Sequence, residues 1–68
     1  MSGIYKIVEV VGTSPQSFAE AVKGAVREAA QTIRHMDWFE VTDQRGRIVD
    51  GAVAEFQVTV KIGFKVER

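Results

Sequence analysis

Residues 52–66 alternate between apolar and polar side chains with a period of two, which is the pattern of a strand that buries one face. The fifteen residues of this segment, at roughly 3.3 Å each, reach about 50 Å, well beyond the usual length of a strand. A strand of this length has to bend or to extend beyond the rest of its subunit. The apolar positions that define its buried face are Ala52, Ala54, Phe56, Val58, Val60, Ile62, Phe64 and Val66.

A second long strand is predicted from about residue 34 to residue 49, directly before the first. Asp50-Gly51 separates the two strands, and this pair is typical of tight hairpin turns. Arg45-Gly46-Arg47 interrupts the alternation, which indicates a bulge where the strand changes direction.

The N-terminal part of the chain predicts a strand followed by a helix. Residues 4–11 are rich in β-branched side chains. Gly12-Thr13-Ser14-Pro15 then predicts a turn, with Ser14 as the N-cap and Pro15 at the first helical position. In the middle of the helix, Gly24 costs roughly 1 kcal/mol relative to alanine, and we expect it to allow close packing against a neighbouring backbone. The helix is defined by an apolar stripe at spacings of three and four residues: Phe18, Ala21, Val22, Ala25, Val26, Ala29, Ala30 and Ile33.

The order strand, helix, strand, strand places the chain in the α+β class, as one domain over residues 1–68. Short connections send the first two strands in one direction and the third strand in the opposite direction. An all-antiparallel sheet then requires the third strand in the centre, which gives the order 1-3-2 with the helix packed on one face. One helix covers only part of one face, so the overhanging strand ends and the opposite face are left for partners. We therefore expect a closed homo-oligomer.

Length and composition support self-association and exclude several classes of protein. A chain of 68 residues has room for one core, and it contains no cysteine for disulfides or thiolate metal sites. Nine Lys and Arg residues balance nine Asp and Glu residues, which argues against a nucleic acid or an anionic membrane held by net charge. No apolar run is long enough to cross a bilayer, and the N-terminus lacks the regions of a signal peptide, so we expect a cytoplasmic protein.

Trp38, the only tryptophan, is predicted to lie on the polar face of its strand. With strict alternation, the same face carries Glu40, Thr42 and Gln44. Gln57 lies on the polar face of the next strand. A flat aromatic ring outside the core, beside an amide that both donates and accepts hydrogen bonds, suits a planar heterocycle, and it also suits a subunit contact.

The segments that carry a family resemblance are Gly12-Thr13-Ser14, the alanine-rich helix, Trp38-Phe39-Glu40-Val41, Asp50-Gly51, and the run from Phe56-Gln57-Val58 to Gly63-Phe64. Together they resemble dodecin, a family of small flavin-binding proteins of bacteria and haloarchaea, over residues 5–67. The resemblance implies a β-α-β-β subunit whose strands wrap around the helix, assembled into a hollow homododecamer. It also implies flavins bound in pairs at subunit interfaces, sandwiched between symmetry-related tryptophans.

For the site, the resemblance implies Trp38 as the stacking tryptophan and Gln57 as the amide at the polar edge of the isoalloxazine. Stacking of an aromatic side chain on a heterocyclic base contributes roughly 1–3 kcal/mol, and contact with an electron-rich indole should quench an excited flavin. Bacterial members resemble binders of phosphorylated flavin, so FMN is the expected cofactor, with riboflavin and FAD as alternatives. Arg45 or Arg47 would then contact the phosphate in a charge-assisted, bidentate bond.

Other roles for these residues remain open from the sequence. Arg45 and Arg47 equally suit surface salt bridges with Asp43 or Asp50, which contribute little to stability. Trp38 also suits a docking role in a small oligomeric interaction module. A further alternative is stacking on single-stranded nucleic acid, against which the neutral charge argues.

An enzymatic function is not expected. The candidate serines cluster around the start of the helix, whereas the one histidine, His35, lies beyond its end, so a nucleophile and a base do not meet. His35 also has no second histidine or cysteine with which to complete a metal site. A paired flavin stacked on tryptophan is covered on both faces and leaves no room for a substrate. The expected function is non-enzymatic flavin storage and photoprotection.

Overall fold

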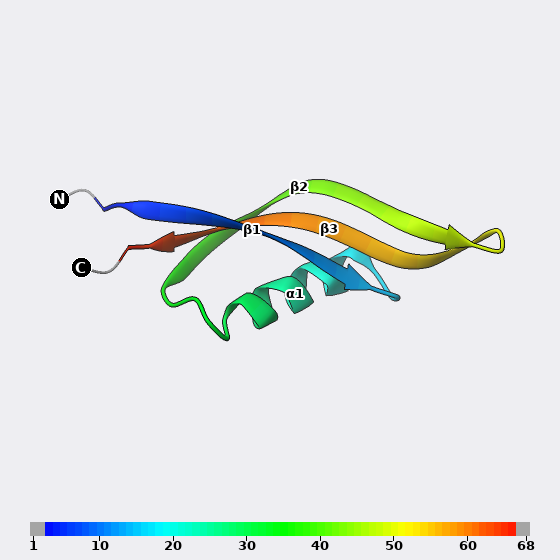
Figure 1. The fold of residues 1–68 in the computed structure, drawn as a ribbon, viewed down its shortest axis with the longest axis horizontal. Coiled ribbons are helices and arrows are strands. Elements are labelled where there is room, and N and C mark those ends of the chain that lie inside the picture. Colours follow the sequence, from blue (N-terminus) through cyan, green and yellow to red (C-terminus); the bar gives the residue numbers. More distant parts are fainter. Residues whose placement is uncertain (1–2, 67–68) are drawn as a thin grey trace.

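The computed structural model of the protein describes residues 3–66, which form three strands and one helix. The elements follow the order β1 (Tyr5–Ser14), α1 (Phe18–Ala29), β2 (Met36–Val49) and β3 (Ala52–Lys65) (Figure 1). This arrangement confirms the predicted β-α-β-β order and the α+β class.

The three strands form one antiparallel sheet in the order β1-β3-β2, as predicted. β3 pairs with β1 along one edge and with β2 along the other. Val60 in the middle of β3 lies opposite Val10 of β1 and Val41 of β2, so the apolar positions of the three strands meet on one face.

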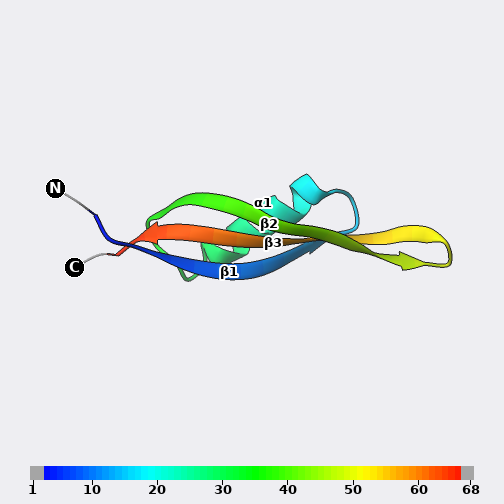
Figure 2. The same cartoon turned by 90° about the horizontal axis from the view of Figure 1, so that it is seen from above.

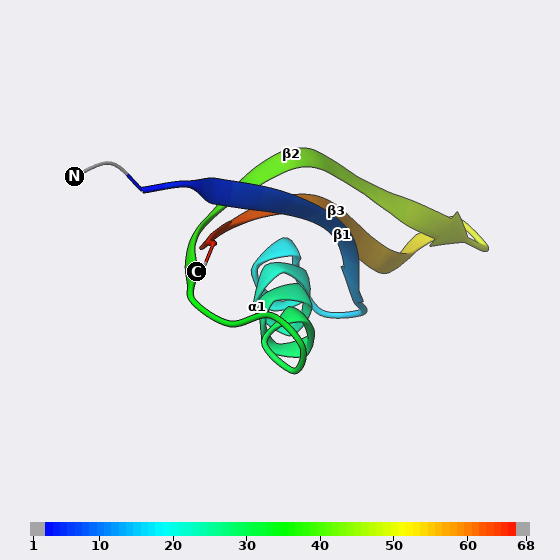
Figure 3. The ribbon, with the colours of Figure 1, turned by 60° about the vertical axis from the view of Figure 1, so that its left-hand side comes forward.

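The two long strands extend well beyond the helix. The described residues measure 53 Å along their longest axis and 20 Å and 13 Å along the other two. The β2–β3 hairpin projects past α1 and the end of β1 (Figures 1 and 2). Figure 3 shows the sheet curving over the helix, so both predicted outcomes for long strands, bending and overhang, are present. Asp50 and Gly51 form the hairpin turn at φ 53° and 78°, the left-handed pair that such turns require.

The core lies between α1 and the covered face of β3. Val58, Val60 and Ile62 have at most 1% of their surface exposed. Opposite them, α1 contributes Ala21, Ala25 and Ala29, all buried, while larger apolar residues at the flanks of the helix are only partly covered. Small side chains in the contact stripe let the helix axis lie close to the sheet.

The prediction for the start of the helix is wrong. β1 continues to Ser14, which pairs with Phe56, so Ser14 cannot cap the helix. Its Oγ instead accepts a hydrogen bond from the Gln16 backbone N–H at 3.0 Å. The N-cap is Ser17, whose Oγ accepts from the Glu20 backbone N–H at 3.0 Å. Pro15 therefore lies in the connection and not at the first helical position, and the helix ends at Ala29, before the predicted stripe does.

The close approach expected at Gly24 occurs at Gly12 instead. A Cβ built on Gly24 has no atom within 4 Å, so that glycine faces open space. A Cβ on Gly12 would lie 2.8 Å from the Cβ of Ala25 and would overlap the carbonyl oxygen of Ala21. The helix therefore packs closely against β1 at this glycine. Any larger residue at position 12 would push α1 away from the sheet.

β2 pairs with β3 through three irregularities, between Met36 and Trp38, between Val41 and Asp43, and between Arg47 and Ile48. The bulge predicted within residues 45–47 lies directly after them. Residues 45–47 pair regularly with β3, and the register changes between Arg47 and Ile48. The shift after Val41 was not predicted, and it changes which side chains share a face.

α1 has 12 residues, and the described part of the chain contains no helix that is long and apolar enough to span a membrane.

Candidate functional site

The candidate site lies on the outer face of the sheet, the face directed away from α1. On β3 this face carries the residues that alternate with the buried valines and isoleucine: Glu55, Gln57, Thr59, Lys61 and Gly63. Their partners on β2, in the same order, are Arg47, Arg45, Asp43, Glu40 and Trp38.

The bulge at Thr42 determines this arrangement. Before it, Trp38 and Glu40 lie on the outer face, as strict alternation predicts. The extra residue reverses the phase, so that Gln44 pairs with the buried Val58 and its predicted place beside Trp38 is wrong. Arg45 moves to the outer face for the same reason. Without the bulge, Arg45 would point toward the helix side of the sheet.

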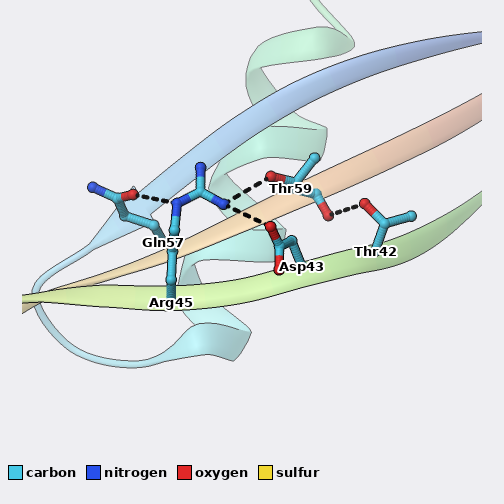
Figure 4. Close-up of polar contacts among 5 residues, drawn as sticks. All are labelled: Thr42, Asp43, Arg45, Gln57 and Thr59. Carbon is cyan, nitrogen blue, oxygen red and sulfur yellow. Dashed lines mark hydrogen bonds and ion pairs between the residues drawn. The ribbon is translucent and has the colours of Figure 1, made fainter.

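Two of the predicted site residues, Arg45 and Gln57, are in direct contact. The Arg45 Nε donates a hydrogen bond to the Gln57 Oε1 at 3.0 Å (Figure 4). The same guanidinium donates through Nη1 to a carboxylate oxygen of Asp43 at 3.1 Å and to the Thr59 Oγ1 at 3.3 Å. Thr42, on the bulge, donates to the Thr59 carbonyl oxygen at 3.4 Å. A polar network therefore spans β2 and β3 on the outer face.

The amide of Gln57 has a second partner on its own strand. Its Nε2 donates to the Glu55 Oε1 at 2.9 Å. Gln57 is only half-buried, so the remaining hydrogen-bonding capacity of the amide is open to a ligand.

The salt bridge considered for Arg45 from the sequence is confirmed with Asp43 as partner. The two side chains are 45% and 66% exposed, so the ion pair contributes little to stability. Arg47 lies opposite Glu55 in the register but makes no hydrogen bond or ion pair with any residue from 3 to 66. Its guanidinium therefore has no competing polar contact within these residues.

Trp38 lies at the other end of the outer face. It is 44% exposed, and the six-membered ring of its indole covers Gly63, where a Cβ would overlap three indole carbons. Tyr5 supports the indole from the side, with ring centroids 5.2 Å apart and planes tilted by 56°. Glycine at position 63 and Tyr5 at the start of β1 together give the exposed tryptophan a defined seat.

The structure does not bring Trp38 and Gln57 together within one subunit. Their positions on β3 are Gly63 and Gln57 itself, which are separated by about 20 Å of strand at roughly 3.3 Å per residue. A ligand that contacts both side chains must therefore take them from different subunits.

The alternation of residues 52–66 predicted Glu55 and Thr59 on the same face as Gln57, but their contacts with the site residues were not predicted, and Tyr5 was missed. Glu55 and Thr59 carried a usable signal, because both alternate in phase with Gln57 along the same strand. Tyr5 did not, since its contact with Trp38 crosses β3 and depends on the small size of Gly63.

The comparisons with known proteins cover nearly the whole chain. A family model described as dodecin matches residues 4–67. Dodecin of Thermus thermophilus is 45% identical over 67 residues, which make up 98% of this chain and 97% of that protein. The chain belongs to the dodecin family. It is therefore one of a family of small binding proteins.

Solved structures of dodecins have the same fold. The dodecin from Streptomyces coelicolor has a TM-score of 0.94 and 53% sequence identity, and the match covers 97% of this chain and 94% of that chain. The calcium dodecin of Mycobacterium tuberculosis, described as calcium-chelating and with a calcium-binding site, has a TM-score of 0.82 at 25% identity, over 94% of this chain and 91% of that chain. Within residues 3–66 of the present dodecin, no group of three or more acidic, histidine or cysteine side chains could hold a metal ion.

Proposed function

We propose that this protein binds flavin, with FMN as the ligand and Trp38 as the stacking platform, in a non-enzymatic storage and photoprotection role. The observation that carries the proposal is the seat of Trp38 on Gly63. A tryptophan side chain is usually mostly buried in a monomeric domain. Here the indole of Trp38 lies on a glycine and is 44% exposed. In a member of the dodecin family, that geometry favours a planar ligand.

Stacking accounts for both the affinity and the expected photochemistry. Contact between an aromatic side chain and a heterocyclic base contributes about 1–3 kcal/mol, and it needs no particular pattern of hydrogen bonds. Because indole is electron-rich, contact with an excited flavin permits rapid electron transfer from Trp38 to the flavin. Return of that electron to Trp38 then leaves both groups in their ground states. Photoprotection follows from the same contact that binds the ligand.

The proposed site is completed by a second copy of the chain. Trp38 and Gln57 are too far apart in one subunit to meet the same flavin, so one copy supplies the indole and another supplies the amide. Large apolar side chains that the single chain leaves open support this assembly: Ile48 is 74% exposed and Val53 60% exposed. We propose the homododecamer as the assembled form, since closed symmetry covers such surfaces without leaving new ones.

The phosphate of FMN is assigned to the arginines of the outer face. Arg47 is the main candidate, because its guanidinium makes no polar contact within residues 3–66, and a planar guanidinium matches a phosphate with two parallel hydrogen bonds. Arg45 already donates to Gln57, Asp43 and Thr59, so only its Nη2 group remains for the ligand.

The test is a titration of ligand-free protein with FMN, followed by flavin fluorescence. The native chain is expected to quench the flavin almost completely and saturably. Trp38→Ala should lose binding by tenfold or more, which corresponds to about 1.4 kcal/mol of lost stacking.

Trp38→Phe is the matched control, because it keeps a flat ring but is a much poorer electron donor. It should retain measurable binding while quenching less. If the native oligomer, intact by size-exclusion chromatography, left flavin emission unchanged at micromolar protein, the proposal would be wrong. An interaction module that docks a protein partner on Trp38 would then be the better explanation.

A further inference from the structure

The side-chain amide of Gln57 is held from both sides by partners of opposite kind. The Arg45 Nε donates to its oxygen at 3.0 Å, as Figure 4 shows, and its nitrogen donates to the Glu55 Oε1 at 2.9 Å. Arg45 comes from β2 and Glu55 from β3, so the amide bridges a neighbouring strand and its own strand.

These partners fix which end of the amide is oxygen and which is nitrogen. A guanidinium can only donate hydrogen bonds, and an ionised carboxylate can only accept them. Rotation of the amide by 180° would set its NH₂ against the donor of Arg45 and its oxygen against the carboxylate of Glu55. Both hydrogen bonds would be lost, and each would be replaced by a repulsive contact.

The locked amide still has capacity for a ligand. Its oxygen has two lone pairs, of which Arg45 uses one, and its nitrogen has two N–H groups, of which Glu55 uses one. One acceptor and one donor therefore remain side by side in a fixed order. Their complement is a ligand edge in which a ring N–H lies next to a carbonyl oxygen.

We infer that Glu55 is a positioning residue that gives Gln57 a single hydrogen-bonding polarity, and that it thereby makes the site select ligands with an imide edge. The inference rests on the proposed flavin binding. Glu55 acts through Gln57 and does not itself touch the ligand, and the ligand feature on which selection depends is the imide N–H.

The role of Arg45 follows from the same geometry. Its two contacts with Asp43 and Thr59 hold the guanidinium in place, so that Nε can serve as a fixed donor to the Gln57 oxygen. Arg45 alone still leaves the nitrogen end free to swing away from the ligand. Both partners are needed to hold the amide plane, and Glu55 is the partner that fixes the nitrogen.

The experiment compares riboflavin with N3-methylriboflavin, in which a methyl group replaces the imide hydrogen. Dissociation constants are measured by fluorescence for the native oligomer and for Glu55→Ala. In the native protein, methylation should weaken binding about tenfold or more, because it removes the donor and leaves the locked acceptor unpaired. In Glu55→Ala the nitrogen end of the amide is no longer held, so the Gln57 side chain can swing away from the methyl group and the penalty for methylation should fall to about threefold or less.

The ratio of the two constants separates positioning from general damage. A change that only weakens the fold or the oligomer affects both flavins alike and leaves the ratio unchanged. Glu55→Gln serves as a second variant if the alanine variant does not assemble; it keeps an acceptor but can also donate, and should give an intermediate ratio. Glu9→Ala is the control, since Glu9 is an exposed carboxylate on β1, opposite Lys61, and should keep the native ratio.

The two proposals fail in different ways. If the native oligomer binds neither of these flavins nor FMN, the proposed function is wrong, and so is the role of Glu55 that rests on it. If riboflavin binds tightly and Glu55→Ala keeps the native penalty for methylation, flavin binding stands and the positioning role of Glu55 is overturned.

Discussion

The two faces of β3 use alternate residues of one strand for different purposes. On the face toward α1, Val58, Val60 and Ile62 are almost completely buried, and they pack against three alanines of the helix. On the outer face, Gln57 has hydrogen-bond partners on both sides, and Gly63 carries the indole of Trp38. The first set has no polar atoms on its side chains, and the second keeps donors and acceptors available. Stability and ligand binding can therefore be changed separately by substitutions one residue apart.

The largest expected effect follows from removing side-chain volume on the covered face. Ile62 is 1% exposed at the centre of the core, and Ile62→Ala should lower the free energy of unfolding by about 2–5 kcal/mol. For a domain of this size each kcal/mol lowers the Tm by roughly 4–8 °C. Thermal unfolding followed by circular dichroism, at equal protein concentrations because the protein is expected to be oligomeric, measures the change. A Tm within about 3 °C of the native value would show that this face does not determine stability.

A substitution at Gly63, one position further along the strand, should lower the affinity for the ligand and leave the Tm nearly unchanged. Gly63→Ala would place a methyl group where the Trp38 indole now lies, and the ring would have to leave its seat. The core beneath is untouched, so we expect the Tm to change by no more than a few degrees. FMN affinity, in contrast, should fall about tenfold as the stacking platform is displaced, which corresponds to about 1.4 kcal/mol.

The matched control for this variant is Tyr5→Phe, which keeps the ring beside Trp38 and should retain both affinity and Tm. If Gly63→Ala bound FMN as tightly as the native chain, the glycine seat would have no role in binding. If it unfolded at a much lower temperature, the two faces would not be separable at this position.

Most of the fold follows from two periodicities in the sequence. The alternation of residues 52–66 predicts the long central strand, and the stripe at spacings of three and four predicts the helix. The 1-3-2 order then follows from short connections. The helix start could not be placed as well, because Ser14 and Ser17 both suit an N-cap. Pairing of Ser14 with Phe56, a contact distant in sequence, decides between them.

On β2 the outer face could be predicted from Trp38 only as far as the bulge that follows Val41. Trp38 is on the expected face because alternation holds up to Val41. Thr42 is a good strand residue and gives no local sign that it will be the extra residue of a bulge. Because this bulge reverses the alternation, the contact between Arg45 and Gln57 could not be derived from alternation alone. The resemblance to dodecin implied a role in binding for both residues but not their contact with each other.

The smallest expected effect comes from substitutions at Gly24 and Gly12. The sequence predicted a close backbone contact at Gly24, whereas the structure has it at Gly12. Gly24 faces open space in the middle of α1, so Gly24→Ala removes the entropic cost of glycine without a clash and should raise stability by about 0.5–1 kcal/mol. Gly12→Ala makes the same chemical change where the new methyl group meets Ala21 and Ala25, and it should lower the Tm. Measured side by side, the two variants test whether α1 rests on β1 at Gly12. Equal shifts of the Tm in the same direction would contradict that contact, because identical substitutions can differ only through what surrounds them.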